Sequence, residues 1–221
     1  MLIVIIPTFQ AQAGLSQLLP QLVGERIVVA DGGSTDETLP MAVASGAVLA
    51  VGATGRGAQL RLGAKLATLT GEPGDWFLFL HADSQLPKTW TSVVETAMVE
   101  GEPRYFRFKA AATGVRAWLM NQLVALRCAT LGLPYGDQGL LIPRTLYEQI
   151  GGYAPMALFE DVDLVERLSK VSSLRPLPAE LTTDVSAHWR DGLWARGTRN
   201  LGLLWRYKRG VTVDELLRAY R

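Results

Sequence analysis

Short apolar runs alternate with helical patterns along the first half of the chain, and this alternation limits the possible folds more than any other feature. The apolar runs lack a polar residue at every second position, which is typical of strands covered on both faces. The stretch 15–22 places four leucines at i, i+3, i+4 and i+7, one face of a helix. The predicted strands cover 2–6, 26–30, 47–52 and 76–80, and the predicted helices cover 15–22, 36–45 and 57–69.

This alternation predicts an α/β fold with a mostly parallel central sheet and helices on both faces. Hydrophobic residues make up 48% of the chain, enough for a sizeable core. The second half is less regular. It predicts a strand over 104–109, a loop and short strand over 135–143, helices near 144–150 and 160–170, and a helical C-terminus.

Charge and cysteine content exclude several classes of protein. The net charge of +1 gives no reason to expect a nucleic-acid partner. Cys128 is the single cysteine, so an internal disulfide and a multi-cysteine metal site are excluded. No apolar run approaches the ~20 residues of a membrane-spanning helix. The apolar stretch at the start of the sequence is shorter than the hydrophobic region of a signal peptide, so we expect none here. We read 117–134 as a buried or interfacial helix and expect a cytoplasmic protein.

Ligands of parallel α/β sheets bind outside the carboxyl ends of the strands. Asp31 stands at one such end, before two glycines that permit close backbone approach. Its carboxylate could accept N–H or hydroxyl groups of a ligand, or it could serve turn chemistry alone. Ser34 and Glu37 have the spacing of a capping box. The other predicted ends are Pro7-Thr8, 52–57 and 81–83.

The glycine-rich stretch 51–65 fails as a dinucleotide motif, because Leu60 stands where the third glycine belongs. It also fails as a phosphate loop, because Ala58 follows Gly57. Arg56, between two glycines before a helix, is the better candidate for contact with an anion. The basic residues at 61 and 65 could equally form a solvated face.

Asp83 follows the fourth predicted strand and offers a hard oxygen ligand for Mn²⁺ or Mg²⁺. The alternative is that Asp83 caps a helix starting near Pro87. His81 could be a second metal ligand, a phosphate contact, or a strand-end histidine bonded to backbone.

Two acidic residues, Glu160 and Asp161, begin a predicted helix. They could simply suit the helix dipole, or one of them could face the cleft as a general base. The segment 188–210 interleaves basic and aromatic residues, which could lie on an anionic membrane surface or form a docked helix with a solvated face. His188, at its start, could approach the active site.

Taken in order, these motifs resemble the family-2 glycosyltransferases of the GT-A fold. "IIPTFQ" resembles the family's opening, and "DGGSTDET" resembles its D-D-G-S-T-D-G-T, with Gly32 in place of the second aspartate. His81-Ala82-Asp83 resembles the D-x-D motif, with His81 in place of the first aspartate. Glu160-Asp161 resembles the family's E-D pair, and 136–153 resembles its acceptor-side segment.

The resemblance implies a GT-A-type nucleotide-diphospho-sugar transferase fold and an inverting, metal-dependent sugar transfer to an acceptor hydroxyl. It implies one domain over 1–221, with a nucleotide-sugar-binding half over 1–110, an acceptor half over 111–180 and a helical C-terminus over 181–221. The implied base is Asp161, beside Glu160, and the implied metal ligands are Asp83 and His81. The implied donor contacts are Pro7, Thr8, Asp31, Gly33, Arg56, Gly57, His81, Ala82 and Asp83, and the implied acceptor contacts are Asp137, Gln138 and Glu160.

The spellings "DGGSTD", "GRGAQLRLGA", "LHADSQLP" and "GDQG" also resemble a subgroup associated with radical-SAM and selenium-related proteins, some described as arsenosugar-biosynthesis glycosyltransferases. Two alternatives stay open. A nucleotidyltransferase would release pyrophosphate from a nucleoside triphosphate, whereas a glycosyltransferase releases a nucleoside diphosphate. A non-catalytic sugar-nucleotide-binding module would bind a nucleoside diphosphate and form no product.

Overall fold

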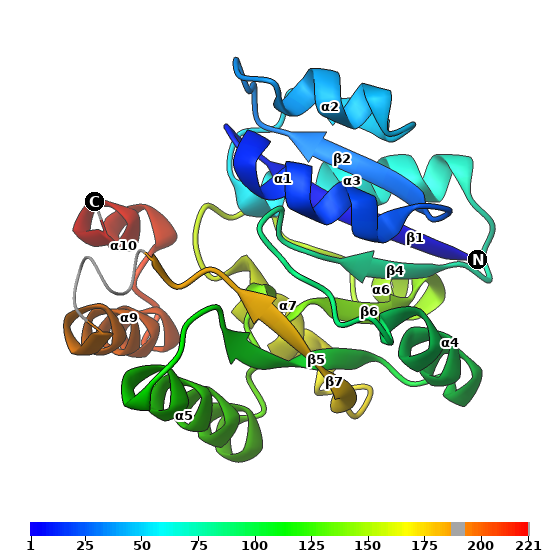
Figure 1. Cartoon of the computed structure of the whole chain (residues 1–221). Helices are drawn as coiled ribbons and strands as arrows, with labels where there is room; N and C mark the ends of the chain where they lie inside the picture. Colours follow the sequence, from blue (N-terminus) through cyan, green and yellow to red (C-terminus); the bar gives the residue numbers. More distant parts are fainter. Residues whose placement is uncertain (187–192, 221) are drawn as a thin grey trace.

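A computed structural model describes residues 1–186 and 193–220 of the chain. Its centre is a seven-stranded sheet with the strand order β3-β2-β1-β4-β6-β5-β7 (Figure 1). Only β6 runs antiparallel to its neighbours among these strands, so six carboxyl ends meet at one edge. The strands are β1 (Leu2–Thr8), β2 (Arg26–Asp31), β3 (Val48–Val51), β4 (Trp76–Phe79), β5 (Arg104–Ala110), β6 (Leu140–Pro143) and β7 (Arg175–Thr183).

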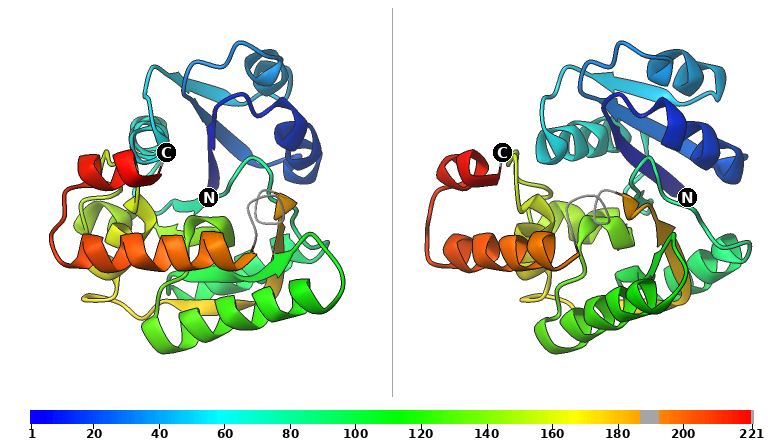
Figure 2. Two further views of the ribbon diagram at one scale, coloured as in Figure 1. Left: turned by 90° about the vertical axis from the view of Figure 1, so that its left-hand side faces the viewer. Right: turned by 60° about the vertical axis from the view of Figure 1, so that its left-hand side comes forward.

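Helices cover both faces of the sheet, as the strand and helix alternation predicts (Figures 1 and 2). Successive residues of β1 point to opposite faces. Ile3 and Ile5 therefore pack with α3, α6 and α7, whereas Val4 and Ile6 pack with α1 and α4. The described helices are α1 (Gln12–Leu18), η1 (Leu19–Leu22), α2 (Thr38–Ala44), α3 (Arg56–Thr70), α4 (Trp90–Glu100), α5 (Val115–Leu131), η2 (Gly136–Gln138), α6 (Arg144–Gln149), α7 (Glu160–Leu168), α9 (Leu193–Lys208) and α10 (Val213–Tyr220).

The strand β7 is the main element that the sequence analysis did not predict. Its segment contains Pro176 and Pro178, and proline cannot donate a ladder hydrogen bond. The structure places β7 at the edge of the sheet, paired with β5 on one side and bridged on the other only by Gln85 to Thr182 among the described residues, so its prolines need not donate to a second strand. None of the helices that the structure describes has the length and hydrophobicity needed to cross a membrane.

The central strand β4 offers a direct test of the core. Leu78 is fully buried and lies in register with Val4 of β1 and Leu141 of β6. Leu78→Ala should lower the free energy of unfolding by about 2–5 kcal/mol, because it removes buried methyl groups and leaves a cavity. The control Leu69→Ala, at a side chain 73% exposed on α3, should change it by less than about 0.5 kcal/mol in the same urea titration. Equal losses in both variants would contradict the placement of β4.

Candidate active site

The carboxyl ends of β1 and β2 are joined by the side chain of Asp31, which is fully buried. Its Oδ2 accepts hydrogen bonds from Thr8 Oγ1 at 2.8 Å and Ser34 Oγ at 2.6 Å. Its Oδ1 accepts from the backbone N–H groups of Gly33 and Ser34, at 2.8 and 2.7 Å. Burial acts to raise the pKa of Asp31, but these hydrogen bonds outweigh it and lower the pKa below its ordinary value.

Asp31 therefore holds the turn, and a direct contact between Asp31 and a ligand stays a prediction. The predicted capping box is wrong. The Ser34 hydroxyl donates a hydrogen bond to Asp31, and α2 begins later, at Thr38, with Glu37 as its N-cap residue. Ser34 lies four residues before the start of α2, and both its hydroxyl and its backbone N–H are bonded to Asp31.

A cleft of about 400 Å³ opens beside this turn. Phe9 lines it directly after β1 and is 63% exposed, which is unusual for a large aromatic side chain. Gln59 lines its floor and donates to the backbone carbonyls of Thr8 and Ala30, at 2.5 and 3.1 Å. The sequence analysis missed both residues. Phe9 could have been found from its place at a strand end, whereas no local pattern marks Gln59. The cleft is also lined by Pro7, Gln10, Arg56, His81, Ala82 and Asp83.

The helix α3 begins at this cleft with Arg56, the first helical residue. Gly57 follows and lies against the loop 154–156. A Cβ on Gly57 would stand 2.5 Å from the carbonyl oxygen of Met156 and 2.6 Å from that of Ala154. Because these are rigid backbone atoms, only glycine fits there. The structure thus gives Gly57 a packing role, and its contact with the donor stays a prediction.

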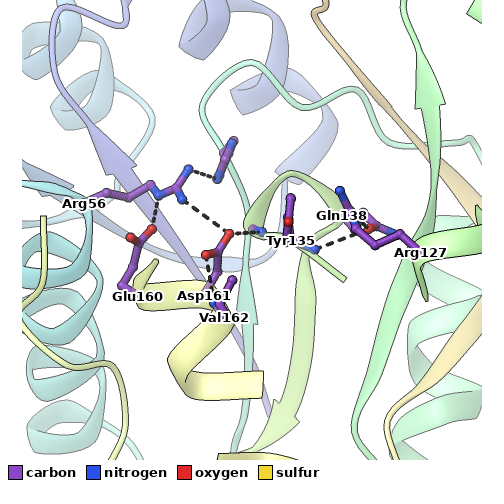
Figure 3. A network of polar contacts seen from close by, with 9 residues as sticks. Arg56, Arg127, Tyr135, Gln138, Glu160, Asp161 and Val162 are labelled. Atoms are coloured by element: carbon purple, nitrogen blue, oxygen red, sulfur yellow. Dashed lines mark hydrogen bonds and ion pairs between the residues drawn. The ribbon is translucent and has the colours of Figure 1, made fainter. Parts of the chain in front are cut away.

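Arg56 is the centre of a polar network that joins α3 to the start of α7 (Figure 3). Its Nε donates to Glu160 Oε1, and its second terminal nitrogen donates to Asp161 Oδ2 at 3.4 Å. Burial acts to lower the pKa of Arg56. The negative charges of Asp161 and Glu160 outweigh burial, and the net effect raises the pKa above its ordinary value. The guanidinium is therefore a permanent cation between two carboxylates.

The two carboxylates have different surroundings. Glu160 is 1% exposed, and burial raises its pKa even though Arg56 acts in the opposite direction. This burial opposes the predicted contact between Glu160 and the acceptor, because its oxygen atoms face Arg56. Asp161 is 8% exposed, and its Oδ2 also accepts from the backbone N–H of Gly136 at 2.8 Å. Asp161 is thus the member of the pair that borders open space.

His81 lies on the other side of the guanidinium, with its Nε2 atom 3.3 Å from a terminal nitrogen of Arg56. Burial and the charge of Arg56 lower the pKa of His81 to about 3, so the imidazole is neutral near pH 7. Because arginine can only donate, the Nε2 lone pair accepts this hydrogen bond. This arrangement opposes the predicted metal role of His81, since the nitrogen atom facing the site already has a partner.

Asp83 fits a divalent ion better. Its side chain is exposed at the end of β4 and lines both cavities of the site. The alternative cap role is wrong, because α4 begins at Trp90 with Thr89 as its N-cap residue. Within residues 1–186 and 193–220, no three side chains of the metal-binding types gather closely enough to hold an ion alone. A hard ion at Asp83 would thus need phosphate oxygens from a ligand, the usual arrangement for Mg²⁺.

A second cavity of about 280 Å³ lies on the far side of Arg56. It contains Asp161 and Asp137, and burial raises the pKa of Asp137. The Oδ1 atom of Asp137 is buried without a hydrogen-bond partner in the described part of the chain. Such an atom is costly unless water or a ligand satisfies it, and the acceptor contact of Asp137 stays a prediction. Other lining residues are Phe108, Tyr135, Phe159, Thr183, Asp184 and Asn200.

The surroundings of Gln138 oppose its predicted contact with the acceptor, which stays untested. Gln138 is 1% exposed, and its Oε1 accepts from Arg127 at 2.9 Å (Figure 3). Its Nε2 donates to the carbonyl of Phe106 at 3.3 Å. Gln138 therefore fixes η2, the turn that carries Gly136 and Asp137 into the site. His188 lies outside the described residues.

The Asp31 turn leads to a prediction about stability and pH. Asp31→Asn should lower the free energy of unfolding by about 1–3 kcal/mol, because an amide N–H₂ would face hydrogen-bond donors. The pKa of an aspartate in an unfolded chain is about 3.9, and the folded pKa of Asp31 is lower. The ionised carboxylate therefore stabilises the folded state fully at pH values above the unfolded pKa. This stabilisation is lost as the pH falls through the folded pKa. Urea titrations of both proteins from neutral to acid pH should therefore converge at low pH.

The matched control is Glu37→Gln, an exposed substitution in the same loop that should leave stability unchanged. A loss in Glu37→Gln as large as that in Asp31→Asn would contradict the assigned role of Asp31.

Comparisons with known proteins agree with this geometry. A family model described as "Glycosyl transferase family 2" matches residues 3–122, more than half of the chain. No curated protein matches. The crystal structure of S. aureus TarS 1–349 in complex with UDP-GlcNAc is similar, with a TM-score of 0.64 and 15% identity, covering 83% of this chain and 58% of that chain.

TarS 1–349 from S. aureus without a named ligand has a TM-score of 0.61 and 16% identity, covering 82% of this chain and 57% of that chain. Glucosyl-3-phosphoglycerate synthase from Mycobacterium tuberculosis, in complex with Mn²⁺, UDP and glucosyl-3-phosphoglycerate, has a TM-score of 0.54 and 19% identity, covering 84% of this chain and 70% of that chain. The chain thus spans less than two thirds of the TarS chains, and at these identities the likeness establishes the fold alone. From the family match, the chain belongs to glycosyl transferase family 2.

Proposed function

We propose that the chain transfers a sugar from a nucleotide-diphospho-sugar donor to an acceptor hydroxyl, with inversion and with the help of a divalent ion. The observation that carries this proposal is the junction of the two cavities. Arg56, His81 and Asp83 line both of them. A donor in the first cavity and an acceptor in the second would therefore meet at these three side chains, beside Asp161.

The donor would occupy the cleft at the ends of β1, β2 and β4. The exposed ring of Phe9 offers a face on which a base can stack. The diphosphate would lie against Arg56 and the backbone N–H groups at the start of α3, where the helix dipole favours an anion. TarS with UDP-GlcNAc and the mycobacterial synthase with UDP support a donor of this chemical class.

Mn²⁺ or Mg²⁺ would be held by Asp83 together with the phosphates of the donor. When bound, the ion neutralises charge on the diphosphate leaving group. The Mn²⁺ in the mycobacterial synthase supports this assignment, and the exposed carboxylate of Asp83 supplies the ligand chemistry. Arg56 adds a second positive charge at the same place, so charge that develops as the sugar leaves meets a preorganised cation.

Asp161 would remove the proton of the acceptor hydroxyl, and that oxygen would attack the anomeric carbon from the face opposite the diphosphate. Gly136 and Arg56 hold Oδ2 of Asp161 in place, and Val162 N–H donates to Oδ1 at 2.8 Å. Asp137, with its unpartnered Oδ1, would orient the acceptor. Glu160 acts through Arg56, as a positioning residue.

Four finer assignments also stay proposals: the division of one domain into donor, acceptor and C-terminal parts, the radical-SAM-associated subgroup, a cytoplasmic location and a membrane contact through 188–210. The subgroup rests on the four motif spellings alone. Of the segment 188–210, residues 188–192 lie outside the described structure.

Asp161→Asn should lower turnover by about 10²–10⁴-fold, because the amide cannot accept the hydroxyl proton. Binding of the donor should be unchanged, since Asp161 lies on the acceptor side of Arg56. The measurement is release of nucleoside diphosphate from a panel of diphospho-sugars and acceptors, beside a calorimetric titration with nucleoside diphosphate. The control Glu166→Gln, on the same helix but paired with Lys208, should keep full turnover.

Normal turnover in Asp161→Asn would remove Asp161 as the base. Release of pyrophosphate from a nucleoside triphosphate would instead favour a nucleotidyltransferase. Binding without any product over the panel would favour a non-catalytic module.

A thermal-shift series tests the metal assignment. Uridine diphosphate with Mn²⁺ should raise the unfolding temperature, since a ligand at about 100 times its Kd stabilises the folded state by about 2.7 kcal/mol. The shift should be much smaller without Mn²⁺ and should be lost in Asp83→Asn, which removes a charged ligand. Mn²⁺ alone is the control and should have no effect. A shift in Asp83→Asn equal to that of the unaltered chain would refute the role of Asp83.

A further inference from the structure

The helix α5 has an unpartnered outer face that is apolar. Its inner face packs Ala117 and Met120 against Phe108 and Ala110 of β5. The opposite side carries four large apolar side chains, which we call the α5 strip. Figures 1 and 2 place α5 at the outer edge of the molecule, with β5 on its inner side. The α5 strip consists of Val115, Trp118, Leu123 and Leu126, with exposed fractions of 79%, 61%, 41% and 58%.

The helix α9 presents similar chemistry on the same side of the molecule. Leu203 and Leu204 are buried, and Leu204 packs against α7, whereas Leu201 and Trp205 are more than half exposed. The left panel of Figure 2 shows α5 and α9 running alongside one another on the side that faces the viewer. Two neighbouring helices thus expose large apolar residues, and each includes a tryptophan. Exposed apolar residues gathered in this way mark an interaction surface.

The charges on these two helices have one sign. Neither α5 nor α9 contains an aspartate or a glutamate within its bounds. Arg116 of α5 and Arg206 of α9 are exposed, and neither forms an ion pair with any residue that the structure describes. Arg209 lies over the ring of Trp205, 3.5 Å from its centre. The apolar residues are therefore bordered by cations.

We propose that the outward faces of α5 and α9 dock the chain on an anionic lipid surface. Tryptophan prefers the boundary between headgroups and acyl chains, leucine and valine enter the acyl region, and each arginine near an anionic headgroup adds to the attraction. A second copy of the chain fits less well, because a contact between two such surfaces would gather the arginines of both copies with no acidic residue of α5 or α9 to pair with them. Charge complementarity therefore selects lipid over self-association.

This surface differs from the membrane contact predicted over 188–210, because α5 supplies most of its apolar residues. The helix leads through residues 132–135 to η2, which carries Gly136 and Asp137 into the site. Docking along α5 would hold the second cavity close to the lipid surface. The proposal concerns a surface outside the donor cleft, so it does not depend on the transfer chemistry.

Co-sedimentation with vesicles tests the proposal. The full chain should bind vesicles of equimolar phosphatidylcholine and phosphatidylglycerol, and should not bind vesicles of phosphatidylcholine alone. Trp118→Glu/Leu126→Glu should weaken binding at least about tenfold, because it places two carboxylates in the acyl boundary. Arg116→Glu/Arg206→Glu should weaken it by a similar factor and should reduce its dependence on salt.

The matched control is Val23→Glu/Leu69→Glu, which alters two side chains that are 84% and 73% exposed elsewhere. It should bind the vesicles as the unaltered chain does. Uridine diphosphate binding, measured on every variant, should be unchanged, which separates this proposal from the donor proposal. No binding of the unaltered chain to anionic vesicles would overturn the proposal, as would equal loss in the control. Self-association in sedimentation equilibrium that Trp118→Glu/Leu126→Glu abolishes, without vesicle binding, would also overturn it.

Discussion

The contact between the Arg56 guanidinium and the Glu160–Asp161 pair is the interaction on which the rest of the site depends. Glu160 is almost completely buried, and a buried carboxylate without a partner would protonate or destabilise the fold. Arg56 supplies the partner from the start of α3, about a hundred residues earlier in the chain. The same cation fixes Asp161 and faces the lone pair of His81. The Arg56 side chain thus joins the start of α3, the start of α7 and the segment that follows β4.

Close approach of backbone makes this junction possible. A Cβ on Gly136 would stand 3.0 Å from His81 Nε2 and 3.5 Å from Asp161 Oδ2, so a larger residue would crowd the imidazole of His81. Gln138 and Arg127 hold η2 from behind, where the guanidinium of Arg127 also stacks 3.5 Å from the centre of the Tyr135 ring. Gln138 and Arg127 thus fix the turn that carries Gly136 and Asp137 from behind the site, whereas Arg56 and the backbone of Gly136 fix Asp161 from within it.

The first four strands and the helices between them could be predicted from the sequence, because continuous apolar runs and helical spacing report burial directly. The strand β7 could not, since its two prolines argue against a central strand and only the tertiary structure reveals an edge position. The strand over 104–109 was predicted, but its place between antiparallel β6 and parallel β7 was not. Pairing between distant segments leaves no local pattern.

The residues of the candidate site also include some that the sequence could predict and some that it could not. The sequence indicated Arg56, Asp83 and Asp161 from strand ends and helix starts, and the structure brings all three to one place. It misjudged Ser34 and did not indicate the burial of Gln138, because a motif specifies spacing and not burial. It missed Gln59, whose amide joins two strand ends that only the fold makes neighbours.

A nucleotide-diphospho-sugar should bind where α3, β1, β2 and β4 meet, at the Arg56 junction. A crystal structure of the chain with uridine diphosphate and Mn²⁺ would locate the ligand. We expect density for the base near Phe9, with the diphosphate between Arg56 and the ion at Asp83. A diphosphate bound at another edge of the sheet, or in this cleft without contact to Arg56 and Asp83, would contradict it.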